Sequence, residues 1–246
     1  MIEFAQFLTP TFAFATAAAL LGGLFMGFTG FGSTLVMVPF LSIVYGPPEA
    51  VAVGVAISAA GLAQVVPQAS RNAVWKDVIP TCIAALILIP VGTAFLLLTD
   101  PAVTRRLIGA VVLLVAVIML RGWSYNGPRN RMASSICGAV GGFTNGYFGI
   151  GAPAVTFYFL SKGVSAAVAR ANILLTIGVF SVATIIAIAI GGGIGPDTGV
   201  RAIVLFIPYS AALWAGSRLF QNASDDLYRR TALWLLMAMG ATVIIF

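Results

Sequence analysis

Long apolar runs separated by short polar connections are the feature that most limits the folds open to this chain. Several of them approach or exceed the ~18 residues read as a membrane-spanning helix. They cover Thr11–Met26, Pro80–Leu98, Leu107–Leu120, Ile173–Ile190 and Ala232–Phe246. Of the 246 residues, 60% are hydrophobic and only 8% are charged, whereas a soluble domain of this size exposes far more charge. We therefore predict an all-α polytopic membrane protein.

A glycine pattern occurs twice in the sequence, at a fixed offset of 119 residues. The matching positions are Gly22, Gly23, Gly27, Gly30 and Gly32 in the first copy and Gly141, Gly142, Gly146, Gly149 and Gly151 in the second. Such a match indicates an internal duplication. We predict a first transmembrane repeat over residues 1–122, a cytoplasmic linker over 123–131 and a second transmembrane repeat over 132–246.

Each half contains about five apolar segments, which we expect to be helices. In the first half they cover residues 9–26, 31–45, 50–66, 78–98 and 104–120, and in the second 132–145, 150–160, 166–190, 201–219 and 228–246. Thr9 is expected to cap the first helix, with Pro10 at its first position. The first residues carry an acid and no basic cluster, so we expect no cleaved signal peptide.

The glycine-rich stretch of each half is either a kink in one long helix or a point at which the chain turns back. With a kink, the 13 Lys and Arg residues divide almost evenly across the membrane, whereas with a turn ten of them fall on one side. Those ten are Arg71, Lys76, Arg121, Arg129, Arg131, Lys162, Arg170, Arg218, Arg229 and Arg230. Because Lys and Arg accumulate on the cytoplasmic side, the turn is favoured. It inverts the two halves relative to each other and places both termini outside.

The segments that follow the two turns are too short to cross a bilayer. As helices, Phe31–Tyr45 would be ~22 Å long and Ile150–Leu160 ~17 Å, against ~30 Å of hydrocarbon. We predict that both are re-entrant or broken helices whose tips meet near the membrane midplane. The simpler alternative is that the glycines only allow close helix packing, because Gly23/Gly27 and Gly142/Gly146 have small-xxx-small spacing.

The two tips are the predicted binding site. A helix N-terminus presents unpaired N–H groups and partial positive charge, so two such ends form an anion site without a buried cation. Outgoing helices also end there, so a cation remains conceivable, although no acidic residue lies in the middle of a span. The candidate binding residues are Thr29, Gly30, Gly32, Ser33, Thr34, Thr144, Asn145, Gly149, Gly151, Ala152, Asn172 and Thr176. Gln64, Gln68 and Arg170 are candidates for a gate or path.

The paired motifs "GFTGFGSTLVMVPFL", which begins at Gly27, and "GYFGIGAPAVTFYFL", which begins at Gly146, resemble those of the TauE/SafE-like sulfite exporter family of membrane anion permeases. The resemblance extends over nearly the whole chain. It implies transport of a small anion, such as sulfite or an organosulfonate, usually outward across a bacterial inner membrane. In such a membrane, the orientation indicated by the basic residues places both termini in the periplasm. Asn172 and Thr176 stand where the first half has Val53 and Ile57, so the two halves contribute unequally to a site.

Other classes of function fit the sequence less well. The chain has no histidine, and Cys82 and Cys137 lie in apolar segments as small hydrophobic residues, so we predict no metal site, no cofactor and no enzyme activity. The basic residues lie between apolar runs, which indicates control of topology and no nucleic-acid partner. The expected partners are the lipid bilayer and a small anion. A passive anion channel, a structural subunit and a homodimer remain open, and a membrane-embedded enzyme is a less favoured alternative.

Overall fold

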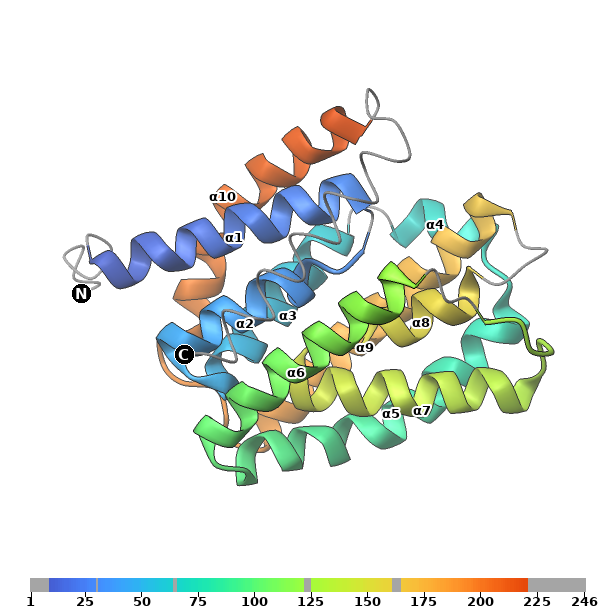
Figure 1. The fold of residues 1–246 in the computed structure, drawn as a ribbon, viewed down its shortest axis with the longest axis horizontal. Coiled ribbons are helices and arrows are strands. Elements are labelled where there is room, and N and C mark those ends of the chain that lie inside the picture. Colours follow the sequence, from blue (N-terminus) through green and yellow to red (C-terminus); the bar gives the residue numbers. More distant parts are fainter. Residues whose placement is uncertain (1–8, 30, 64–65, 122–124, 161–164, 221–246) are drawn as a thin grey trace.

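The computed structural model describes residues 9–29, 31–63, 66–121, 125–160 and 165–220. Within these ranges the chain is helical, with no strand (Figure 1). The helices are α1 (Pro10–Thr29), α2 (Ser33–Tyr45), α3 (Pro47–Ala63), α4 (Val66–Asn72), α5 (Trp75–Leu98), α6 (Pro101–Leu120), α7 (Arg131–Phe148), α8 (Ala152–Phe159), α9 (Ala166–Ile190) and α10 (Thr198–Phe220). Among them α1, α5, α6, α9 and α10 are long and apolar enough to cross a membrane. The predicted all-α polytopic class is confirmed.

The helix boundaries follow from local sequence signals. The α1 helix begins at Pro10 after Thr9, whose hydroxyl accepts a hydrogen bond from the Phe12 N–H at 3.3 Å, as the cap prediction required. Asn130 caps α7 by accepting from the Ala133 N–H at 2.8 Å. The short helix α4 was not predicted, because its polar sequence "QASRN" is typical of a connection. The predicted segment 228–246 lies outside the described residues.

The chain turns back at both glycine-rich stretches, so the kink is excluded. The Phe14 and Phe40 rings, near the outer ends of α1 and α2, are 5.7 Å apart. In the second half, the hydroxyls of Ser134 in α7 and Tyr158 in α8 are 2.7 Å apart. The returning helices have 13 and 8 residues, so they are about 20 Å and 12 Å long. Both are shorter than the ~30 Å hydrocarbon layer.

Two parallel helix pairs form the outer framework, α1 with α10 and α5 with α7 (Figure 1). Glycines create both contacts, because a Cβ atom at Gly23 or Gly27 would collide with the α10 backbone. Gly142 and Gly146 meet the α5 backbone in the same way. Close packing is therefore the role of these four glycines. Gly32, Gly149 and Gly151 instead lie in the turns.

Each pair joins a helix of the first half to a helix of the second half. The helices α1 and α7 hold corresponding positions in the two halves, and so do α5 and α10. Gly92 in α5 lies against the Phe143 carbonyl of α7, and Gly216 in α10 lies against the Leu24 carbonyl of α1. Leu24 and Phe143 are separated by 119 residues, whereas Gly92 and Gly216 are separated by 124 (216 − 92). The second half therefore has about five additional residues before α10, in the glycine-rich connection that follows α9.

The connections gather at two ends of the molecule. At one, which we name the linker end, Arg129 of the linker forms an ion pair of 2.6 Å with Asp77 at the start of α5. At the opposite end, Arg201 of α10 forms an ion pair of 3.1 Å with Glu49 of α3. Because α5 begins at the linker end and α10 begins at the opposite end, the α5/α7 and α1/α10 pairs run in opposite directions.

Replacing Glu49 by Gln is expected to weaken the contact between α3 and α10. The Glu49 carboxylate accepts hydrogen bonds from Thr198, at 2.7 Å, and Arg201, and Gln retains only part of this contact. The expected loss is about 1 kcal/mol, smaller at high salt. Thermal unfolding of the purified protein in detergent, at two salt concentrations, measures it. Asp197→Asn is the control, because Asp197 is 59% exposed and its ion pair with Arg201 is 3.5 Å long. An equal loss of thermal stability in Glu49→Gln and Asp197→Asn would show that Glu49 does not stabilise the contact between α3 and α10.

Candidate functional site

The first turn brings a glycine and two hydroxyl residues to the start of α2. Gly32 precedes the helix with φ of +82°, a conformation that favours glycine, and no side chain caps the helix there. Ser33 is buried and its Oγ lies 3.0 Å from the Oγ of Ser58 in α3. Thr34 is also buried. Thr29 is the last residue of α1, and Gly30 lies outside the described residues.

The second turn is held by Asn145, which lies one turn before the end of α7. Its Oδ1 accepts a hydrogen bond from the Gly151 N–H at 3.1 Å, and its Nδ2 donates to the Thr184 hydroxyl of α9 at 2.8 Å. Gly149 has a φ of +69° and its N–H donates to the Asn145 carbonyl at 2.8 Å. Both Asn145 and Thr184 are buried. Asn145 therefore connects the end of α7 to Gly151 across the turn, and it also links the turn to α9.

Two buried helix N-termini without side-chain caps thus follow the two turns. Ser33 begins α2 and Ala152 begins α8, and neither helix has a capping side chain. The first N–H groups of a helix have no intrahelical acceptor, and a buried helix end without partners is unusual. The second turn offers fewer amides, because the Gly151 N–H is bound to Asn145 and Pro153 has none. The stronger candidate for an anion contact is therefore the start of α2.

The two turns lie close to each other. A Cβ atom at Gly149 would be 3.3 Å from the side chains of both Val38 in α2 and Val51 in α3. Val38 is five residues from Ser33, which is about 8 Å along the helix. The second turn is therefore packed against the first hairpin about one and a half helical turns from its tip.

Asn172 and Thr176 lie on α9 nearer to the linker end than Thr184, which contacts the second turn. The Asn172 Oδ1 accepts a hydrogen bond from the Val74 N–H at 2.8 Å, at the connection between α4 and α5. The Thr176 hydroxyl donates to the Asn172 carbonyl at 2.8 Å. Asn172 precedes Thr184 by 12 residues on α9, which is about 18 Å. The structure therefore does not bring Asn172 to the turns.

The remaining candidates lie towards the linker end, outside the described residues or, in the case of Thr144, near the second turn at the end of α7. Arg170 is exposed at the start of α9. Gln68 belongs to α4, and Gln64 lies outside the described part of the chain. The Thr144 hydroxyl donates to the Val140 carbonyl of its own helix at 2.9 Å, so it is occupied within α7. Among the described residues no three His, Cys, Asp or Glu side chains gather into a group that could hold a metal ion.

Comparison with known proteins decides the family. The family model described as "Sulfite exporter TauE/SafE" matches residues 15–243. The chain belongs to the TauE/SafE sulfite exporter family. No curated protein and no solved structure matches it. TauE/SafE is a transporter family, so this TauE/SafE protein is a multi-pass membrane protein whose general function is the export of sulfite or a related anion.

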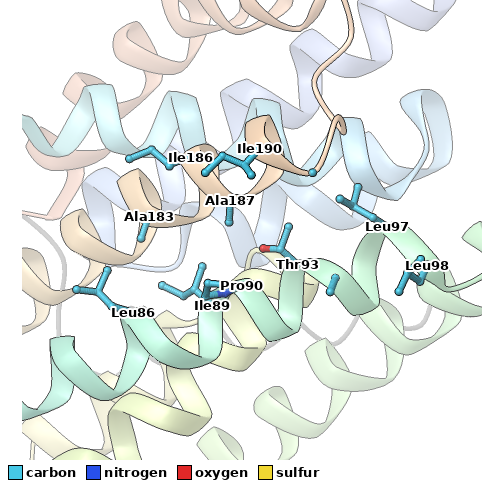
Figure 2. Close-up of a pocket in the computed structure, with 12 residues that line it drawn as sticks. Leu86, Ile89, Pro90, Thr93, Leu97, Leu98, Ala183, Ile186, Ala187 and Ile190 are labelled. Atoms are coloured by element: carbon cyan, nitrogen blue, oxygen red, sulfur yellow. The ribbon is translucent and has the colours of Figure 1, made fainter.

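A groove between α5 and α9 opens near the second turn, but it is not suited to an anion. It encloses about 580 Å³ and is lined mainly by aliphatic side chains, among them Leu86, Ile89, Ile186 and Ile190 (Figure 2). Thr93 is its polar side chain, and its hydroxyl donates to the Gly146 carbonyl at 3.4 Å. Leu86 and Ile186 are about half exposed and Ile190 is 83% exposed. Such a surface is suited to contact with hydrocarbon.

Three polar residues at the turns of this TauE/SafE protein were not predicted as site residues. Ser58 contacts Ser33, Thr184 contacts Asn145, and the buried Tyr209 of α10 lies beside Gly23 and Gly61. Ser58 and Thr184 had a sequence signal, because a polar side chain inside a span needs a partner. Tyr209 was not recognised, because a tyrosine in a membrane helix is usually interpreted as an anchor at the membrane–water interface.

Proposed function

We propose that this TauE/SafE protein is a secondary transporter that exports a small anion, such as sulfite or an organosulfonate, through a midplane site between the two turns. The site comprises Thr29, Gly30, Gly32, Ser33 and Thr34 from the first turn and Asn145, Gly149, Gly151 and Ala152 from the second. The observation that carries the proposal is the presence of two buried helix N-termini without side-chain caps, close together and followed by short returning helices.

Alternate exposure of this site follows from the packing of the second turn on the first hairpin. Gly149 lies against Val38 and Val51, which separate the turn from the start of α2. Movement of one hairpin away from these two valines would open the site to one side, and an anion that favours one arrangement shifts the equilibrium towards it. Residues 1–122 and 132–246 act in this proposal as two inverted repeats joined by the linker 123–131. The opposite directions of the α1/α10 and α5/α7 pairs support it.

Asn172 and Thr176 belong in this proposal to the path between the linker end and the turns. Asn172 is fully buried, and its Nδ2 has no hydrogen-bond partner among the described residues. A buried unpartnered donor in a span is a reasonable transient contact for a passing anion. The exposed Arg170 then lies at the mouth of the path, where it attracts anions. Gln64 and Gln68 remain predictions.

The proposed location is a bacterial inner membrane, with the linker end in the cytoplasm and both termini in the periplasm. The charge distribution supports this orientation, because Arg71, Lys76, Arg129, Arg131 and Arg170 lie at the linker end, while Arg105, Arg106 and Arg201 lie at the other. Fusions of a phosphatase, active only in the periplasm, and of a fluorescent protein, active only in the cytoplasm, to Phe246 test it. Phosphatase activity is expected, and fluorescence would overturn the orientation.

Reconstitution tests the function itself. The purified protein in liposomes is expected to move sulfite, methanesulfonate or a carboxylate with saturable kinetics. An anion on the far side of the membrane is expected to accelerate uptake of labelled anion, because a transporter alternates between faces, whereas a passive channel shows no such exchange. No flux of any anion in the panel would overturn the proposal and favour a structural subunit. Chemical change of the anion would indicate an enzyme.

A further inference from the structure

Tyr209 carries a hydroxyl group that has no hydrogen-bond partner among the described residues. The side chain is fully buried in the middle of α10. An unpaired buried hydroxyl typically costs about 1–3 kcal/mol of stability. Most buried polar groups in proteins are hydrogen-bonded, so an exception in a native structure needs an explanation.

The Tyr209 hydroxyl is directed at the start of α2. Its oxygen lies 3.5 Å from the position that a Cβ atom would take at Gly61 in α3, and the Ser33 side chain is near enough to influence the hydroxyl without completing a hydrogen bond of good geometry. Ser58, whose Oγ is 3.0 Å from that of Ser33, precedes Gly61 by three residues and so lies on the same face of α3. Three hydroxyl groups from three helices therefore gather beside a buried helix N-terminus that no side chain caps.

Filling of space explains the ring of Tyr209 but not its hydroxyl. The position that corresponds to Gly61 in the second half is Phe180, 119 residues later, and Phe180 is a fully buried ring packed at Gly141 and Gly151. In the first half Gly61 has no side chain, and Tyr209 brings a ring to the same place from α10. A phenylalanine would fill this space equally well, so the hydroxyl is the part that requires another role.

We propose that Tyr209 binds the transported anion, together with Ser33, Ser58 and the first N–H groups of α2. This inference rests on the proposed function and adds to it a binding residue in the first turn. The donors are all neutral, and no charged side chain is among the buried residues of the described ranges. Burial of a second negative charge without a cation is costly. The site therefore selects a singly charged oxoanion, such as a sulfonate, over a doubly charged one, such as sulfate.

Tyr209→Phe tests the assignment, because it removes only the oxygen atom. In proteoliposomes the variant is expected to show an increase of about tenfold in the KM for methanesulfonate, from the loss of one hydrogen bond to a charged group. Its thermal unfolding temperature without ligand is expected to equal or exceed that of the wild type, because no partner within the described chain is lost. The stabilisation by added methanesulfonate is expected to shrink. Sulfate is expected to compete weakly with methanesulfonate in the wild type.

Tyr158→Phe is the matched control, since Tyr158 is also buried but its hydroxyl lies 2.7 Å from that of Ser134. This variant is expected to lose stability and to keep the wild-type KM. An unchanged KM in Tyr209→Phe, with wild-type flux intact, would overturn the assignment of Tyr209 and leave the proposed function standing. Equal inhibition by sulfate and methanesulfonate would overturn the selection for one charge. Absence of flux in the wild type would overturn the proposed function, and this site with it.

Discussion

Gly142→Leu is expected to prevent the protein from folding into its native helix packing. A Cβ atom at Gly142 would lie 2.5 Å from the Ala85 Cα and 2.8 Å from the Ala85 carbonyl oxygen. These are backbone atoms of α5, so no change of side-chain rotamer relieves the overlap and the two helices must separate. Overpacking typically costs about 1–3 kcal/mol, and this case lies at or above the upper end because the contact is backbone against backbone. Size-exclusion chromatography and thermal unfolding in detergent measure the loss.

Val140→Leu is the matched control for this experiment. Val140 lies on the same helix, two residues before Gly142, and is 51% exposed. The larger side chain extends into lipid or detergent there, so we expect a monodisperse protein with an unfolding temperature close to that of the wild type. If Gly142→Leu behaves like Val140→Leu, α5 and α7 do not make the close contact on which the framework depends.

Most of the fold could be predicted because membrane helices are specified by features visible in a single sequence. Apolar length identified α5, α6 and α9, proline positions marked the start of α1, and the distribution of basic residues favoured a turn over a kink. The contact between Phe14 and Phe40 then confirmed the turn. Helix α4 was missed because its seven residues have no apolar periodicity, and it packs on α9. Tertiary packing of that kind is not encoded locally.

The site could be predicted only in part, because the sequence shows which residues are unusual but not which of them meet. The glycine pattern pointed to the turns, yet its members divide between two roles: Gly23 packs against α10, whereas Gly149 adopts a positive φ. Both roles select glycine, and the sequence alone does not separate them. Tyr209 reaches the first hairpin from the opposite half of the chain, so only the packing of α10 on α1 and α3 reveals its contact with Gly61.

Asn145→Ala is expected to disorganise the second turn and to abolish transport. The substitution leaves the Gly151 N–H and the Thr184 hydroxyl, both buried, without their partner. Each unsatisfied group costs about 1–3 kcal/mol, so the total loss of stability for the two groups is about 2–6 kcal/mol. The turn then loses its hydrogen-bonded link to α9, and the start of α8 no longer has a fixed position relative to α2. Thermal unfolding and anion flux in liposomes measure the two effects.

A graded series at Thr184 separates the function of Asn145 from general damage. Thr184→Ser keeps the hydroxyl that accepts from Asn145 and is expected to behave like the wild type. Thr184→Val removes that acceptor but leaves the bond from the Gly151 N–H to Asn145, so stability and flux are expected to fall between those of Thr184→Ser and Asn145→Ala. This order of stability and flux is expected if the two hydrogen bonds that join Gly151, Asn145 and Thr184 position the second turn. Thr184→Ser breaks neither bond, Thr184→Val breaks one and Asn145→Ala breaks both. Full transport by Asn145→Ala would show that the second turn keeps its geometry without these two hydrogen bonds.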